Sequence, residues 1–428
     1  METGGRRNGS KERQDGRTAK FAALLPLLLA SPAVAQGPVC AADNAGLTLP
    51  DGFCAVVVAA DLGRARHLAV APNGDIVVAV PARDSGGVLV LRDVDGDGVA
   101  DVRRQLIRDP SAADVQLRVA GGRSWLYYGT YHEIIRYPWT PGMDDVAGRG
   151  DTVVRELPGG RQHGIKTFVI TDDGRLFVNL GAPSNACQTA EREAGSIGMD
   201  PCPLLDTTGG IWLFDADRVG QSGRDGERWA TGLRNTVALA VNPADRELYA
   251  AVHGRDQLGQ LWGYSDSASA EKPAEEFVRV TRGINVGWPY CYFDPELGRK
   301  VLAPEYGGDG RAVERCAGMT APLIAFPAHW APDGLEFYTG SQFPTAYRGG
   351  AFLAFHGSWN RAPLPQQGFK IVFIPFDGAT PGTWRVFADG FQDVEGRPVD
   401  VAQAPDGSLV VSDDRGGRVY RILYRGTR

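Results

Sequence analysis

The sequence predicts an all-β protein built as a six-bladed β-propeller. A short turn followed by an alternating apolar strand occurs at 71–80, 120–130, 171–180, 242–251, 331–340 and 404–413. The copies lie roughly 50 to 90 residues apart, a spacing typical of a radial fold in which each copy begins one sheet. The 56 glycines and 28 prolines suit many tight turns, whereas amphipathic helical periods are scarce. Functional groups are therefore expected on loops around the mouth of a central channel.

The 428-residue chain is predicted to hold one large domain after a short leader. Length alone would allow two or three domains, but the repeats extend to the C-terminus. We assign residues 1–35 to a signal peptide and 36–428 to the propeller, with 36–55 as an N-terminal arm closed by a disulfide. The net charge of −6 and the lack of a basic stripe beyond the N-terminus exclude a nucleic-acid partner.

The N-terminus has the pattern of an export signal. Several basic residues precede the apolar run 21–30, and Ala33-Val34-Ala35 is a small-x-small cleavage pattern. The run is too short to span a bilayer, and its alternative interpretation is a tethering helix. We therefore expect a mature chain that begins near Gln36, has no stable membrane span and is periplasmic or secreted.

The six cysteines fall into three neighbouring pairs. Many pairings are possible, and the simplest local set is Cys40–Cys54, Cys187–Cys202 and Cys291–Cys316. Disulfides persist in oxidising compartments, which agrees with export. The sequence has no C-x₂-C doublet, which disfavours a zinc site.

Three long insertions separate the repeats, at 183–209, 263–318 and 357–368. Long loops inside a compact domain are commonly functional. Because two of them carry a predicted disulfide, we expect them to form ordered walls of a site.

Residues 93–101 alternate carboxylates with small residues, and their acidic members are Asp93, Asp95, Asp97 and Asp101. Carboxylates around a glycine-permitted turn can wrap a hard cation with oxygen ligands. An EF-hand would need glutamate at the twelfth position, where this chain has Arg104. The pattern predicts a structural calcium site, and the alternative is a polar hairpin turn without metal.

Two short motifs place candidate site residues just before predicted strands. Arg234 and Asn235 offer a bidentate donor fork and a carboxamide, which suit a planar, carboxylate-rich ligand. His163 precedes an alternating strand, and a histidine at a propeller mouth can act as a general base. Taken singly, the Arg-Asn pair can equally be solvated surface and the histidine a structural hydrogen-bonding residue.

Four longer fragments, taken together, resemble the quinoprotein sugar dehydrogenases, soluble enzymes that carry pyrroloquinoline quinone (PQQ) on a six-bladed propeller. The fragments are 232–258, 283–294, 326–361 and 396–422. The likeness is greatest to the sorbosone dehydrogenase-like branch and covers most of 55–425.

The resemblance implies a role for the residues that match the family's motifs. His163 matches the base that takes the proton of the sugar's anomeric hydroxyl while hydride passes from C1 to the quinone. Arg234 matches the arginine that stabilises charge on the quinone oxygen, and Asn235 a cofactor contact. Gly254 and Arg255 hold the positions whose backbone carbonyls bind a catalytic calcium, a Lewis acid on the quinone.

Other residues match the family's cofactor-binding positions or differ from them. Arg66 and Arg397 match arginines that contact the cofactor. Gln162 replaces an acidic residue before the base, His356 stands where the glucose enzymes have a lysine, and Val399 replaces an arginine. His356 can still hydrogen-bond a quinone carboxylate.

Two residues of a mouth loop, His329 and Trp330, are expected to face the sugar, because an aromatic plane suits a pyranose ring. Ordinary loop packing is the alternative.

The sequence thus predicts an exported PQQ- and calcium-dependent dehydrogenase that oxidises an aldose or a related carbonyl sugar such as sorbosone. No C-x-x-C-H haem motif is present, so electrons are expected to leave to an external acceptor. The alternatives are a calcium-dependent lactonase on the same fold and a non-catalytic binding propeller.

Overall fold

The computed structural model describes residues 1, 5, 37–83, 85–160 and 162–426. Apart from residues 1 and 5, the predicted signal peptide lies outside the described residues. None of the described helices is long and apolar enough to cross a membrane.

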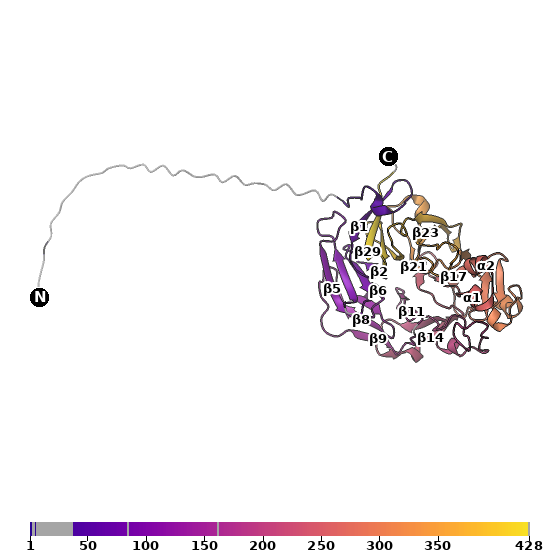
Figure 1. The fold of residues 1–428 in the computed structure, drawn as a ribbon. Coiled ribbons are helices and arrows are strands. Elements are labelled where there is room, and N and C mark those ends of the chain that lie inside the picture. Colours follow the sequence, from indigo (N-terminus) through magenta and orange to yellow (C-terminus); the bar gives the residue numbers. More distant parts are fainter. Residues whose placement is uncertain (2–4, 6–36, 84, 161, 427–428) are drawn as a thin grey trace. The chain divides into compact units, whose positions relative to one another are not determined.

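Six sheets follow one another around an axis and form the six predicted blades (Figure 1). Blade one holds β2 (Leu68–Val70), β3 (Ile76–Val80), β4 (Gly87–Arg92) and β5 (Val102–Arg108). Blade two holds β6 (Asp114–Ala120), β7 (Arg123–Gly129), β8 (Ile134–Pro138) and β9 (Asp151–Arg155), with β13 (Gln221–Ser222) added in parallel to β9. Blade three holds β10 (Phe168–Ile170), β11 (Arg175–Leu180), β12 (Gly210–Asp215) and β14 (Glu227–Thr231).

Blade three contains the first long insertion, 183–209, and blades four and five contain the other two. Blade four holds β15 (Ala238–Val241), β16 (Leu248–Val252), β17 (Glu275–Val280) and β20 (Ile324–Phe326). Blade five holds β21 (Pro332–Phe337), β22 (Ala351–Phe355), β23 (Lys370–Ile374) and β26 (Arg385–Ala388). The insertions add α1 (Leu258–Trp262), α2 (Asp266–Glu271) and two small hairpins, β18 (Cys291–Asp294) with β19 (Arg299–Leu302) and β24 (Phe376–Asp377) with β25 (Thr380–Pro381).

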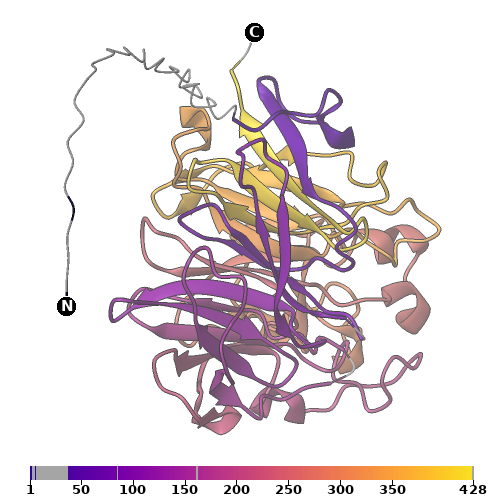
Figure 2. The same cartoon turned by 90° about the vertical axis from the view of Figure 1, so that its left-hand side faces the viewer.

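Both ends of the described propeller meet in blade six, which closes the ring. It holds β27 (Pro398–Gln403), β28 (Leu409–Asp413), β29 (Arg418–Tyr424) and β1 (Phe53–Ala59). β1 pairs antiparallel with β29, so the indigo and yellow parts of the chain share one sheet (Figure 2). This pairing joins the first and last blades without an exposed gap in the ring.

All three predicted disulfides are confirmed: Cys40–Cys54, Cys187–Cys202 and Cys291–Cys316. The first links the N-terminal arm to β1, and the other two lie in the insertions of blades three and four. The arm also forms a backbone hydrogen bond from Ala41 to Ala55.

One repeat differs from its prediction. The copy at 331–340 was expected to be a turn followed by a strand, but Pro332–Phe337 forms the innermost strand of its blade, with a register shift between Pro332 and Gly334. The second strand of that blade is β22 instead. The Pro-Asp-Gly signal is normally a turn, but here Asp333 forms an ion pair with Arg66 in the interior.

The innermost strands of the six blades surround a channel that contains a cavity of about 420 Å³. Its lining includes several titratable residues, among them His67, Asp114, Glu336 and Asp400. Apolar side chains between neighbouring blades form the hydrophobic core, so polar groups are concentrated along the axis.

Candidate active site

A cavity of about 590 Å³ opens at one mouth of the propeller, and all six blades contribute to its walls. The structure brings eight predicted site residues together around it: Arg66, His163, Arg234, Asn235, Gly254, His329, His356 and Arg397. Four of these, Arg66, His163, Arg234 and Arg397, stand shortly before the innermost strand of their blade. Because those strands begin at the same end of the channel, residues far apart in sequence converge there.

His163 is held as a neutral base with one free nitrogen. Its Nδ1 lies 2.5 Å from the carbonyl oxygen of Ala182, and because a carbonyl only accepts, Nδ1 carries the proton. That tautomer leaves a lone pair on Nε2. Burial, and after it the positive charge of Arg234, lowers the pKa of His163 to about 3. The ring therefore stays unprotonated at neutral pH and is able to accept a proton.

Arg234 is 3% exposed, and its guanidinium is fixed by backbone and side-chain acceptors. Nε donates to the carbonyl of Asn185 at 3.1 Å, and Nη1 donates to the carbonyl of Gly254 at 2.9 Å. Nη2 donates to Asn185 Oδ1 at 3.1 Å and to Asp256 Oδ2 at 2.8 Å. The charge is therefore preorganised before any ligand arrives.

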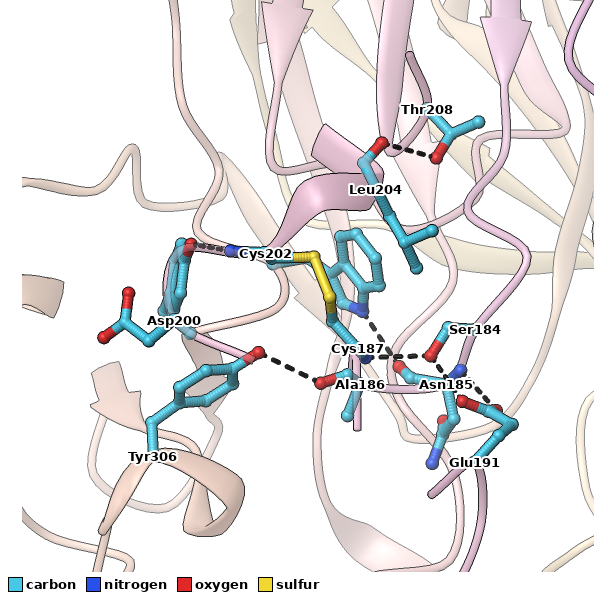
Figure 3. Close-up of a disulfide and its surroundings, with 12 residues drawn as sticks. Ser184, Asn185, Ala186, Cys187, Glu191, Asp200, Cys202, Leu204, Thr208 and Tyr306 are labelled. Carbon is cyan, nitrogen blue, oxygen red and sulfur yellow. Dashed lines mark hydrogen bonds between the residues drawn. A yellow bond between two sulfur atoms is a disulfide. The ribbon is translucent and has the colours of Figure 1, made fainter. Parts of the chain in front are cut away.

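The first long insertion holds Asn185 in place through its disulfide (Figure 3). Cys187, two residues on, bonds to Cys202, and its backbone N–H donates to Ser184 Oγ at 2.8 Å. Glu191 accepts the backbone N–H of Asn185 at 2.8 Å. The disulfide-closed loop thus positions the residue that holds Arg234.

Asp256 connects this loop to Arg234. Its Oδ2 accepts from Arg192 at 2.9 Å as well as from Arg234. Burial alone would raise the pKa of Asp256, but the two guanidinium groups hold it below its usual range. Gln162 accepts from Arg192 Nη2 at 2.9 Å. The glutamine found in place of an acidic residue is therefore a neutral partner of Arg192.

A second ion-pair cluster lies on the opposite wall. Arg66 donates to Asp333 and to Asp414, each at 3.0 Å. His356 Nε2 donates to Asp414 Oδ1 at 2.8 Å. Burial, the largest single cause, raises the pKa of Asp333, but Arg66, His253 and His356 together outweigh it, so the pKa lies below its usual value. Arg397 lies beside His356 and donates to the carbonyls of Gly357 and Ser358, both at 3.2 Å.

Val399 does not reach this cluster. It is a buried residue of β27, which accounts for its apolar character.

The predicted calcium position at Gly254 is flanked by carboxylates. Glu275 Oε2 accepts the backbone N–H of Gly254 at 2.8 Å, and Asp256 lies two residues further along the chain. The side chain of Arg255 points away from the mouth cavity and pairs with the buried Glu305, with Nη1 2.6 Å from Oε1. A cation at Gly254 would share its carbonyl oxygen with Arg234.

Of the two residues predicted to contact the sugar, one lines the cavity and the other is buried in the core. His329 lines the cavity, donates from Nε2 to the carbonyl of Ser269 at 2.9 Å and accepts from Asn360 at its Nδ1. Trp330 is 7% exposed and packs edge-on against Phe355 in the core. The expectation that Trp330 faces the sugar is corrected, because the hydrophobic cluster between blades four and five buries the indole instead.

The acidic segment 93–101 lies apart from the mouth cavity. Asp93, Asp95 and Asp101 bring ligand atoms within 4.8 Å of one another, whereas Asp97 contributes its backbone carbonyl to Val39 of the N-terminal arm. The carboxylates also accept turn N–H groups, as in Gly96 to Asp93 at 2.7 Å. The arrangement is compatible with both earlier interpretations, a calcium loop and a polar turn.

The sequence reasoning missed the acidic half of the site, which consists of Asp256, Glu275, Asp333 and Asp414, together with Asn360. Asp256 follows the calcium motif directly, and Asn360 belongs to the fragment that includes His356, so both could have been noted. Asp333 lies in a Pro-Asp-Gly sequence, a pattern that predicts a turn and gives no indication of a site residue.

The TrAA12-like family model matches residues 47–425, and the chain belongs to this family. A Borreliella burgdorferi protein described as uncharacterized is 31% identical over 263 residues, which are 60% of this chain and 59% of that protein. A PQQ-dependent pyranose dehydrogenase of Coprinopsis cinerea is 26% identical over 274 residues, 53% of this chain and 36% of that protein. The matches thus span only part of these relatives' lengths.

Solved structures share the fold. The Trichoderma reesei AA12 enzyme superposes with a TM-score of 0.74 at 20% identity, covering 89% of this chain and 98% of that one. The PQQ domain of the Coprinopsis cinerea pyranose dehydrogenase gives a TM-score of 0.71 at 20% identity, with 91% and 98% covered. The resemblance to quinoprotein sugar dehydrogenases and the six-bladed fold are both confirmed.

Proposed function

We propose that this protein is a PQQ-dependent dehydrogenase that oxidises an aldose or a related carbonyl sugar such as sorbosone. The observation that carries the proposal is one cavity lined both by a neutral histidine whose Nδ1 carries the proton and by three arginines, Arg66, Arg234 and Arg397. The Coprinopsis cinerea relative, a PQQ-dependent pyranose dehydrogenase, supports the cofactor and the sugar class.

The cavity fits a flat, carboxylate-bearing cofactor. Two buried polar atoms on its walls, Arg66 Nε and Asn360 Oδ1, have no hydrogen-bond partner among the described residues. Arg397 forms no ion pair with a described carboxylate, so its guanidinium is able to bind an anion. Arg66, Asn235, His356 and Arg397 would hold PQQ, which supplies a two-electron acceptor when bound.

The chain's own groups supply the proton chemistry. His163 Nε2 accepts the proton of the sugar hydroxyl, and the Ala182 carbonyl keeps the imidazole in the required tautomer. Arg234 keeps a fixed positive charge in the cavity, where negative charge develops during oxidation. Electrons then leave to an external acceptor.

Two calcium sites belong to the proposal. At the mouth, the carbonyls of Gly254 and Arg255 would bind a catalytic ion. At the blade edge, Asp93, Asp95, Asp97 and Asp101 would bind a structural ion. Export to the periplasm or beyond completes the proposal and is supported by the three disulfides.

A calcium-dependent lactonase needs a metal ringed by free carboxylates, and Asp256, Glu275 and Asp333 do line the mouth. Each is already engaged, Asp256 and Asp333 by arginines and Glu275 by the backbone N–H of Gly254. The geometry therefore favours the dehydrogenase.

The test uses purified mature protein stripped of metal and mixed with PQQ, with or without calcium. Calcium-dependent bleaching of the quinone absorbance by aldoses or sorbosone would support the proposal. Absence of quinone binding would overturn it, and hydrolysis of a lactone panel would replace it with the lactonase.

A further inference from the structure

Two exposed aromatic side chains lie at the mouth of the active-site cavity. Within the described ranges, Tyr131 (40% exposed) and Trp359 (60% exposed) are the only aromatic residues among the exposed large apolar side chains. Both line the cavity of about 590 Å³. Most other aromatic rings of the described chain pack in the clusters between blades. The coincidence of both at one opening calls for a ligand that uses aromatic faces.

The two rings stand on opposite walls. Tyr131 lies between β7 and β8 of blade two, and Trp359 lies between β22 and β23 of blade five. The innermost strands contact one another in the order β2, β6, β10, β15, β21, β27 and back to β2. Blades two and five are therefore three steps apart in a ring of six. A ligand that extends from the cavity toward solvent can therefore contact Tyr131 on one side and Trp359 on the other.

Each of the two aromatic residues lies next to a residue near His163 or Arg234. The Tyr131 ring lies against Gly164, such that a Cβ added there would be 3.3 Å from Cδ1, and Gly164 follows His163 directly. Trp359 precedes Asn360, whose Nδ2 donates to Asp256 at 2.9 Å. Tyr131 is thus next to the residue that follows His163, and Trp359 is next to a residue bonded to Asp256, the partner of Arg234.

We propose that Tyr131 and Trp359 bind a second saccharide ring, and that the substrate is an oligosaccharide oxidised at its reducing end. This inference rests on the proposed function. The reacting ring must place its anomeric hydroxyl within hydrogen-bond reach of His163 Nε2. The next ring then lies at the rim, where an aromatic face covers the apolar C–H face of a pyranose while the hydroxyl groups stay in water.

The test compares glucose with cellobiose and maltose on wild type, Trp359→Ala and Tyr131→Ala, with Leu297→Ala as control. Leu297 is likewise exposed (40%), in the hairpin between β18 and β19. Binding to the PQQ-free protein is measured by calorimetry, and kcat/KM is measured after loading with PQQ and calcium. Thermal unfolding confirms that each variant is folded.

For wild type we expect at least one of the disaccharides to be preferred over glucose in both readouts. Trp359→Ala is expected to reduce that preference by about tenfold, the scale of one aromatic stacking contact, and Tyr131→Ala by a smaller factor. Leu297→Ala should retain it.

Equal affinity for glucose and both disaccharides, or an unaltered preference in Trp359→Ala, would overturn the inference. The same holds if the variants slow only electron transfer to a redox protein, since the rim would then be a docking surface for the acceptor. If calorimetry shows a disaccharide preference but no PQQ-dependent oxidation occurs, the saccharide site at Tyr131 and Trp359 is supported and the proposed function is overturned.

Discussion

The two cavities along the propeller axis share Asp333 and Val237 in their walls but stabilise carboxylates differently. At the mouth, two arginines hold the pKa of Asp256 below the usual range, and Arg66 with His253 and His356 does the same for Asp333. In the channel, burial raises the pKa of Asp114 to about 7 and that of Glu336 to about 8. Charges at the mouth are therefore paired and preorganised, whereas burial in the channel favours the protonated form of Asp114 and Glu336.

The difference follows from where the charged residues stand in each blade. Loops before the innermost strands bring arginines to the mouth, and the long insertion of blade three adds Arg192. The channel walls are strand backbone with alternating side chains, and among the groups that line only the channel the shortest charged contact is His67 Nδ1, 3.4 Å from Asp400 Oδ2. Chemistry that needs fixed charge is thus favoured at the mouth.

Removing the base at the mouth should have the largest effect on activity. His163→Ala is expected to lower turnover of the PQQ-loaded protein by about 10²-fold or more, the scale of a lost general base. PQQ binding, followed by absorbance, should persist because the arginines remain. Turnover equal to wild type would remove His163 from the mechanism.

Breaking the paired charges should cost stability. Asp256→Asn leaves Arg192 and Arg234 without their shared carboxylate, and we expect a loss of about 3 kcal/mol in the free energy of unfolding. Urea denaturation at neutral pH measures it. Asp217→Asn is the control, because Asp217 pairs with Arg118 with its side chain 52% exposed, and exposed pairs contribute less. Equal losses in both variants would contradict the contrast between buried and exposed pairs.

In the channel, the raised pKa of Asp114 predicts that its contribution to stability decreases as the pH rises. Burial raises the pKa of Asp114 from its ordinary value of 3.8 to about 7, so between these pH values the folded state binds a proton that the unfolded state has released. Its contribution to stability is complete below about pH 4 and is lost as the pH rises through 7. Asp114→Asn removes this loss, so its melting temperature relative to wild type should be higher at pH 8 than at pH 5. A difference independent of pH would contradict the protonated state of Asp114.

The smallest effect concerns the coupling of Arg234 to His163. Arg234→Gln removes a positive charge that lowers the pKa of His163, so that pKa should rise. It should stay below its ordinary value because burial is the larger cause. Nitrogen NMR of the imidazole rings, recorded through a pH titration, measures the change. An unaltered pKa would mean that burial alone keeps His163 neutral.

Much of the site could be predicted because the fold repeats. A residue before the innermost strand of one blade has equivalents in the others, so Arg66, His163 and Arg234 could be placed at one mouth from spacing and family motifs. The same logic could not indicate which carboxylates neutralise them. Arg66 pairs with Asp333 and Asp414 across 267 and 348 residues of sequence, and no local pattern encodes such contacts.

The sequence by itself determined the blade number, the disulfide partners and the positions just before the innermost strands that carry the cationic residues. These depend on period, proximity and turn chemistry, which are local properties. Only the tertiary structure decided that Trp330 is a core residue, that Asp333 belongs to a strand and that Trp359 and Tyr131 line the same mouth from different blades. Burial and pairing of this kind arise when blades close into a ring, because each wall is supplied by a different part of the chain.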